Sequence, residues 1–196
     1  MSTPTWVTLA NANQYSQVAS GAVVTNFTTA TDVSPGGSIL GQAFQTSPAQ
    51  LYPGQMWRFS ANGIYSTTSS PGLSLGVYYG GASGSPICYG SVAAASAFTN
   101  CASMPWSLSA MGKLTTVGAS VGIWQVVGFL TGLQPYSPMT GTAITPSLVT
   151  PMPQYTAAAQ YDTSTAVKIT VAATCTSSGA ASVTCYNWGI EYLSEP

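Results

Sequence analysis

Ionisable side chains are almost missing from this sequence. Its 196 residues include no histidine, three basic residues and four acidic residues, so charged residues make up 4%. An average globular domain carries about 25%. Hydrophobic residues make up 45%, which excludes the low-hydrophobicity composition of a disordered chain. We therefore expect a folded protein with an uncharged polar surface, and a near-neutral surface of this kind favours association with other proteins.

The scarcity of basic residues excludes two classes of partner. Nucleic-acid binding depends on cations that neutralise phosphates, and anionic membranes attract basic segments. Three scattered basic side chains supply neither. The densest apolar run, residues 121–130, is about half the roughly 20 residues that a spanning helix needs. The first residues also lack the basic start and apolar stretch of a secretory signal. We expect a protein made in a cytoplasm or already processed, with no nucleic-acid or membrane partner.

The absence of histidine also argues against enzymatic chemistry. It removes the usual general base for a serine or cysteine nucleophile. Without histidine or a closely spaced cysteine pair, the usual zinc sites are excluded as well. Asp162 and Glu191 are the best-placed carboxylates for glycoside hydrolysis, which needs two such groups. We favour a structural role for both, in which Asp162 caps a turn and Glu191 pairs with Lys168 or Arg58. We expect no catalytic residue, no metal and no cofactor.

Apolar and polar residues alternate with a period of two from about residue 50 onward. The pattern is clearest in residues 56–61, 73–79, 106–110, 121–129, 167–173 and 186–192. It predicts β-strands with one buried face. In residues 121–129, the apolar face carries Val121, Ile123, Val127 and Phe129. Helical signals are scarce, because 20 glycines and 13 prolines interrupt the chain.

Many short strands with long connections predict a single all-β domain. We expect a jelly-roll-like antiparallel β-sandwich over residues 51–196. Residues 1–50 have a weaker pattern and are expected to form an extended N-terminal arm and the first strands. A long loop is expected from Gly80 to about Met104, and a Pro/Thr-rich loop over residues 134–154.

The four cysteines predict two local disulfides. Cys175 and Cys185 flank a short segment, and in a hairpin they would face each other across the ladder, close enough to bond. Cys88 and Cys101 bracket an Ala/Ser-rich stretch that a bridge would close. Such bridges would suit a particle that must survive outside a cell. The alternative is four free, partly buried thiols in a reducing cytoplasm.

The aromatic residues are candidates for a binding surface. Tyr65, Tyr78, Tyr79, Trp124 and Tyr186 cannot all face one core, because some of them lie on opposite strand faces. Exposed aromatic side chains either stack on sugar rings or anchor a protein interface. With so few charges nearby we favour an interface, for which Tyr65, Tyr78, Tyr79 and Trp124 are the candidates. For any one of them, ordinary core packing is the alternative.

Three segments carry a family resemblance. They are residues 51–81, with LYPGQ, GIYSTT and PGLSLGVYYGG; residues 104–132, which open on MPW; and the alternating residues 168–194. Together they resemble a group of accessory virion proteins of tailed bacteriophages. The sequence departs from that group in its cysteines. The resemblance implies one jelly-roll domain, often trimeric, attached to the capsid exterior or to the neck or tail, with no catalytic residues.

The resulting hypothesis is a capsid decoration or minor capsid protein. It would be made in the host cytoplasm and exposed on the particle exterior. There it would bind the major capsid protein or other virion proteins as a homo-oligomer, with a trimer favoured by the resemblance. The alternative is a neck, tail-fibre or carbohydrate-binding (receptor-binding) β-sandwich module.

Overall fold

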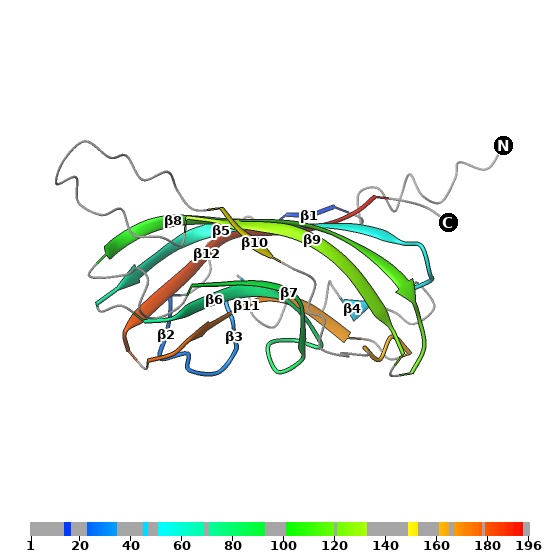
Figure 1. Cartoon of the computed structure of the whole chain (residues 1–196), viewed down its shortest axis with the longest axis horizontal. Coiled ribbons are helices and arrows are strands. Elements are labelled where there is room, and N and C mark those ends of the chain that lie inside the picture. The colour runs from blue at the N-terminus through cyan, green and yellow to red at the C-terminus, as the bar shows by residue number, and fades with distance from the viewer. Residues whose placement is uncertain are drawn as a thin grey trace.

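The computed structural model of the chain is an all-β protein in which two antiparallel sheets pack face to face (Figure 1). It describes residues 14–16, 23–34, 45–46, 51–68, 71–92, 101–119, 121–132, 149–152, 161–164, 167–177 and 179–193. No helix occurs in these residues. The β-sandwich predicted from the alternating pattern is therefore confirmed.

In the described residues, the larger sheet has seven strands. Their order across the sheet is β1, β12, β5, β8, β9 and β10, and β2 also pairs with β12. The strands are β1 (Gln14–Ser16), β2 (Val24–Thr25), β5 (Met56–Thr67), β8 (Cys101–Thr116), β9 (Ile123–Thr131), β10 (Val149–Met152) and β12 (Ala181–Tyr192). The long strands β12, β5, β8 and β9 form the body of this sheet.

The smaller sheet has five strands in the described part of the chain. Their order is β3, β11, β6 and β7, and β4 also pairs with β11. The strands are β3 (Thr31–Asp32), β4 (Gln45–Thr46), β6 (Leu73–Tyr79), β7 (Ser85–Val92) and β11 (Val167–Cys175). This sheet lies under the concave face of the larger one (Figure 1).

The strand pairing is nested along the chain. The last long strand, β12, pairs with β5, and β11 pairs with β6. The hairpins β6–β7 and β8–β9 lie inside this nest. Such an arrangement is compatible with a jelly roll. Strands β1 to β4, from residues 1–50, pair with β11 and β12, while the expected N-terminal arm lies outside the described residues.

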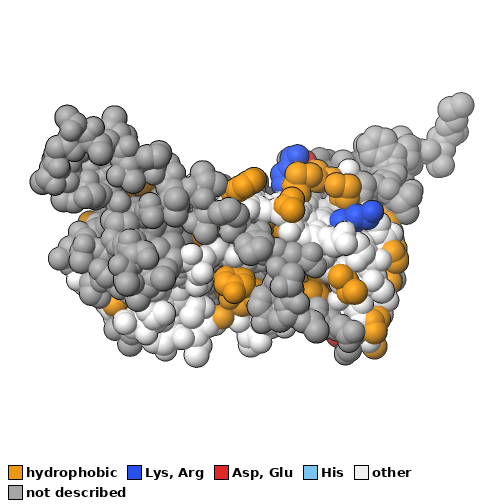
Figure 2. All heavy atoms as spheres, in the orientation of Figure 1, with side chains coloured by type: hydrophobic (Ala, Val, Ile, Leu, Met, Phe, Trp, Pro, Cys, Tyr) orange, Lys and Arg blue, Asp and Glu red, His pale blue; other side chains and the backbone are white. Residues whose placement is uncertain are grey.

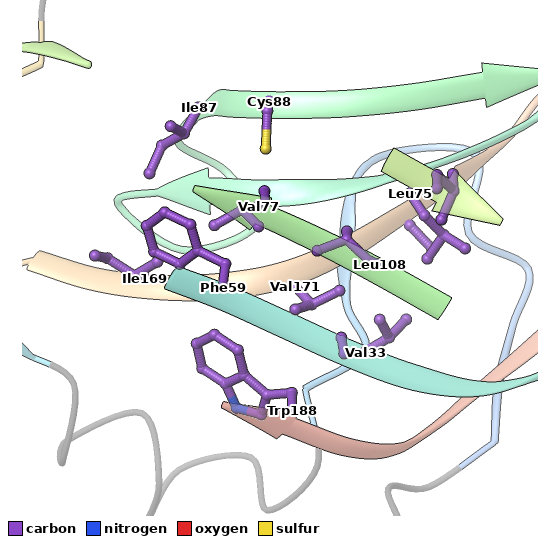
Figure 3. Packing of buried hydrophobic residues seen from close by; sticks show 14 of the residues in the cluster. Val33, Phe59, Leu75, Val77, Ile87, Cys88, Leu108, Ile169, Val171 and Trp188 are labelled. Atoms are coloured by element: carbon purple, nitrogen blue, oxygen red, sulfur yellow. The ribbon is translucent and has the colours of Figure 1, made fainter. Parts of the chain in front are cut away.

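The core lies between the two sheets and is formed by the inward face of each strand (Figure 3). Phe59 and Leu108 project from the larger sheet and Val171 from the smaller one, each at most 1% exposed. Trp124 in β9 contacts both sheets. Its ring centroid is 6.1 Å from that of Phe59 and 6.2 Å from that of Tyr79 in β6. Since full burial of a large apolar side chain contributes about 1.5–3 kcal/mol, this interior holds the sheets together.

Two expected connections differ from the structure. The prediction of a long loop from Gly80 to about Met104 is wrong, because this segment contains β7 and the first residues of β8. Pro86 made this segment resemble a turn, but β7 is an edge strand in the described part of the smaller sheet, where proline is tolerated. In the Pro/Thr-rich residues 134–154, β10 pairs with β9, and the other residues of that loop lie outside the described part.

Candidate functional site

The four aromatic residues expected at a binding surface are all buried. Tyr65 is 1% exposed, Tyr78 9%, Tyr79 4% and Trp124 1%. The expectation that they anchor an interface or stack on a ligand is therefore wrong, and core packing is the correct interpretation. Tyr78 and Tyr79 are both buried, although they lie on opposite faces of β6, because that strand is covered on both sides.

A different set of apolar side chains reaches the surface. We define the outer stripe as Met56, Met111, Ile123, Val127 and Phe129, which all project from the outer face of the larger sheet. Val127 is 72% exposed and Phe129 55%, while the other three are 36–41% exposed. Isolated exposed apolar residues are ordinary on protein surfaces, whereas a contiguous group marks an interaction site.

The strand register brings four members of the outer stripe together, whereas Ile123 is separated from Val127 by Gln125. Val127 in β9 lies directly opposite Met111 in β8, and Phe129 is two residues farther along the same face of β9. Met56 in β5 lies opposite Lys113, which is two residues from Met111 on the outer face of β8. Directly opposed and diagonal residues of neighbouring strands are within contact range of each other. Figure 2 shows apolar side chains grouped beside the basic ones over the larger sheet.

This orientation reverses the one expected for β9. Ile123, Val127 and Phe129 share a face, as expected, but that face is exposed, and Val121, also exposed, lies just before the strand. The inner face carries Trp124, Val126, Gly128 and Leu130, all of them buried. Because the apolar residues of β9 occupy both faces, alternation alone does not indicate which face is inside.

Glycine on the neighbouring strand explains which face of β9 is buried. Gly112 in β8 points into the core, where an added Cβ would lie 3.0 Å from Val126, 3.3 Å from Phe59 and 3.4 Å from Trp124. Because the glycine has no side chain, these three side chains fill the space beside it, and the indole ring of Trp124 is buried there. In the sequence, a tryptophan beside glycines that face the core indicates which face of β9 is buried. The opposite face then carries the exposed apolar residues of the outer stripe, which the alternating pattern alone did not identify.

Two basic residues lie among the members of the outer stripe, since Arg58 is opposite Met111 and Lys113 is opposite Met56. Arg58 in β5 donates to Glu191 in β12 over 2.7 Å, and their side chains are 48% and 34% exposed. This confirms the pairing of Glu191 with Arg58, and an exposed pair of this kind contributes at most about 1 kcal/mol. Lys113 is the other basic residue on this face. The face that carries the outer stripe therefore has a small excess of positive charge, from Lys113.

The carboxylates have structural partners. Asp162 accepts hydrogen bonds from the backbone N–H and the hydroxyl of Ser164, at 2.9 Å and 2.5 Å. The hydroxyl bond, with help from the backbone one, lowers the pKa of Asp162. The expected turn-capping role of Asp162 is therefore confirmed. No group of three or more His, Cys, Asp or Glu side chains that could hold a metal occurs in the described residues.

Both predicted disulfides are wrong. Cys175 lies in β11 of the smaller sheet and Cys185 in β12 of the larger sheet, so the expected hairpin between them does not exist. Both are free, buried thiols, which donate to the carbonyls of Ser177 and Asn187. Cys88 is also a free thiol, which excludes its bridge to Cys101.

Burial makes two of these thiols unreactive. Loss of solvent raises the pKa of Cys88 to about 12 and that of Cys185 to about 12. The thiolate is the nucleophilic form of cysteine, and at neutral pH neither residue populates it appreciably. These two thiols are core side chains.

Comparisons of the chain with protein-family models, curated proteins and solved structures found no match. Its function therefore has to be inferred from its own geometry and from the resemblance described above. In the part of the chain that the structure describes, no helix is long and apolar enough to cross a membrane.

Proposed function

We propose that this chain is a structural virion protein of a tailed bacteriophage, which decorates or cements the capsid exterior through protein–protein contacts. The observation that carries the proposal is the outer stripe, a group of exposed apolar side chains on the regular face of a β-sheet. The resemblance of residues 51–81, 104–132 and 168–194 to accessory virion proteins supplies the biological setting.

The physical basis of this function is mechanical. The sandwich holds the outer sheet face rigid, because both sheets anchor it through the aromatic contacts of Trp124. Covering an apolar face removes it from water, and this contributes about 25 cal/mol for each Å² covered. Each contact adds modestly to the stability of a shell, but symmetry repeats it at every copy.

The composition supports a protein with permanently covered surface. A net charge of −1 provides little self-repulsion, and a surface poor in charge binds by shape and apolar contact more than by electrostatic steering. The four aromatic residues named as interface or ligand candidates are buried, which removes the main support for a carbohydrate-binding module. Tyr186, which was weighed with them, is 38% exposed. A neck or tail location is a variant of the same structural role.

Copy number in purified particles tests the proposal. Quantitative mass spectrometry should find on the order of hundreds of copies per particle, in fixed ratio to the major capsid protein, as expected for a protein repeated by the symmetry of the shell. About six or twelve copies would place the protein in the neck or tail instead. Its absence from particles of the phage that encodes it would refute the structural role.

A control separates cementing from passive attachment. Particles produced without this chain should lose their DNA at a lower temperature than complete particles, because bound neighbours stabilise the shell by mass action. Adding the purified chain back should restore the original temperature. Equal heat resistance with and without the chain would contradict a cementing function.

A further inference from the structure

We infer that Lys168 and Asp32 join covalently, through an amide bond between the side-chain amine of one and the side-chain carboxyl of the other. The structure shows them as an ion pair, with Nζ of Lys168 2.5 Å from Oδ2 of Asp32. The bond would tie β11 to the two-residue strand β3 beside it in the smaller sheet (Figure 1). The inference does not depend on the proposed virion role, and the site lies on the other sheet from the outer stripe.

The reaction is a condensation in which atoms and charges balance. The ammonium of Lys168 passes one proton to the carboxylate of Asp32 across their hydrogen bond, which gives a neutral amine and a carboxylic acid. The amine nitrogen attacks the carboxyl carbon and a C–N bond forms. A second proton then moves from the nitrogen to Oδ2, the bond between the carbon and Oδ2 breaks, and one water molecule leaves. The balance requires no oxidant and no cofactor.

The two groups are held close enough to react. The carboxyl carbon is one C–O bond from Oδ2, so the nitrogen of Lys168 lies at most about 3.7 Å from it. Reacting atoms in near-attack arrangements are about 3–3.5 Å apart, and holding two groups in this way is equivalent to raising their concentration to about 10⁵–10⁸ M. An amide can therefore form between side chains that would not condense as separate molecules in water.

Ser34 supplies the hydrogen-bond donors that such a reaction needs. Its backbone N–H and its hydroxyl both donate to Oδ1 of Asp32, at 2.8 Å and 2.5 Å. Attack on the carboxyl carbon builds negative charge on Oδ1, while Oδ2, next to Lys168, becomes the leaving oxygen. Donors that are already aimed at a developing oxyanion stabilise the transition state. The hydroxyl is held in place, because it also accepts from the backbone N–H of Val171 at 3.0 Å.

The surroundings of the pair limit competition from water. Asp32 lies opposite Ala172 in β11, and Lys168, Thr170 and Ala172 share one face of that strand by alternation. Thr170 and Ala172 are fully buried, and the side chains of Lys168 and Asp32 are 31% and 24% exposed. The buried hydroxyl of Thr170 has no hydrogen-bond partner within the described structure. It lies between Lys168 and Ala172 on this face, so the N–H of the new amide would have an acceptor close by.

Two other carboxylates of the chain serve as comparisons. Asp162 accepts the same two hydrogen bonds from Ser164, but neither ion pair of the described residues involves it, so it has no amine to react with. Glu191 pairs with Arg58, whose guanidinium stays protonated and is no nucleophile. Among the described carboxylates, only Asp32 combines a lysine with a pair of donors on its other oxygen.

The mass of the full chain tests the bond directly. After its cysteines are reduced, wild-type protein that has been folded and incubated at neutral pH should be lighter than its sequence by the mass of one water molecule. Lys168→Arg keeps the positive charge but supplies no nucleophilic amine, so it should have the full mass of its sequence. Asp162→Ala is the matched control at the comparison carboxylate, and it should show the same loss as the wild type.

Digestion with trypsin locates the bond, because the chain has only three basic residues. Cleavage after Arg58, Lys113 and Lys168 gives four peptides, whereas a lysine in amide linkage resists cleavage. The wild type should therefore yield residues 1–58 joined to residues 114–196, and Lys168→Arg should yield the four separate peptides. Ser34→Ala keeps both reacting groups but loses the hydroxyl donor, so after refolding the joined peptides should form roughly a hundredfold more slowly.

A wild type with the full mass of its sequence after incubation would overturn the inference. So would a loss of water that persists in Lys168→Arg, or one that the peptides place elsewhere in the chain. Circular dichroism establishes that each variant is folded, and if Lys168→Arg fails to fold, the mass and peptides of the wild type decide. A joined chain that is absent from particles refutes the virion role alone, and an unjoined chain that occurs on particles refutes the bond alone.

Discussion

The orientation of β9 can be tested with two substitutions in one strand. Trp124→Ala removes a ring that is 1% exposed, and Phe129→Ala removes a ring that is 55% exposed on the opposite face. The two residues differ little in size and share the same strand and sheet. They therefore separate the effect of the buried face from that of the exposed one.

The expected difference in stability is large. Truncation of a buried tryptophan to alanine costs about 3–5 kcal/mol. The substitution Trp124→Ala also removes edge or tilted contacts with the rings of Trp57, Phe59 and Tyr79. Each such contact contributes about 0.5–1.5 kcal/mol, so the cost should lie toward the upper end of that range. Phe129→Ala should cost less than about 1 kcal/mol, as expected for a surface position.

Urea unfolding followed by far-ultraviolet circular dichroism measures both values without depending on tryptophan fluorescence. With a slope near 2 kcal/mol per M, Trp124→Ala should lower the midpoint by about 2 M and Phe129→Ala by less than about 0.5 M. Low protein concentration limits association between chains, which would otherwise contribute to the measured stability. Equal destabilisation by the two variants, or a larger effect of Phe129→Ala, would refute the assignment of the two faces.

Two further predictions concern the interior. Because burial raises the pKa of Cys88 from 9.0 to about 12, the unfolded chain loses this proton first as the pH rises from 9, and the folded state loses stability between about pH 9 and pH 12. Between about pH 8 and pH 10 the free energy of unfolding of the wild type should therefore fall by about 1.4 kcal/mol more than that of Cys88→Ala. Urea unfolding at both pH values measures this difference, and equal losses in the two proteins would contradict the prediction. Gly63→Ala would place a Cβ 1.9 Å from the backbone oxygen of Thr184, so strands β5 and β12 must separate and the cost should exceed about 4 kcal/mol. Gly54→Ala is the control: its added Cβ has no atom within 4 Å, and its only strain comes from a φ of +98°, so it should cost only about 1–3 kcal/mol. Similar melting temperatures for the two glycine variants would show that the structure tolerates the added Cβ at Gly63.

The strands were predictable from the sequence because their signal is local. In β6, for example, Leu73, Leu75 and Val77 alternate along one face and are all buried. The same reasoning identified the segments that became β5, β8, β9, β11 and β12. A period of two describes each strand by itself and needs no knowledge of its neighbours.

The pairing of strands was not predictable in this way. Cys175 and Cys185 are near in sequence, but β11 and β12 enter different sheets, and only long-range pairing decides that. The disulfide hypothesis failed for this reason. The capping role of Asp162 was predictable because its partner, Ser164, is two residues away.

Tyr186 shows a third kind of limit. It belongs by alternation with Trp188 and Ile190, which are buried, yet it is 38% exposed. The register of β12 against β5 shifts between Cys185 and Asn187, and the extra residue of such a bulge lies outside the regular pairing. Bulges depend on the partner strand, so a single segment of sequence does not reveal them.

The two-faced character of β9 also has a consequence for how the chain folds. A slip of one residue in the β8–β9 hairpin exchanges the faces of a strand, and in β9 both faces are apolar, so hydrophobicity alone penalises the slipped hairpin only weakly. Steric fit at Gly112, together with the indole ring of Trp124, then discriminates between the two pairings. Gly112→Ala would remove this selection, and the misaligned hairpin would persist as a kinetic trap during refolding.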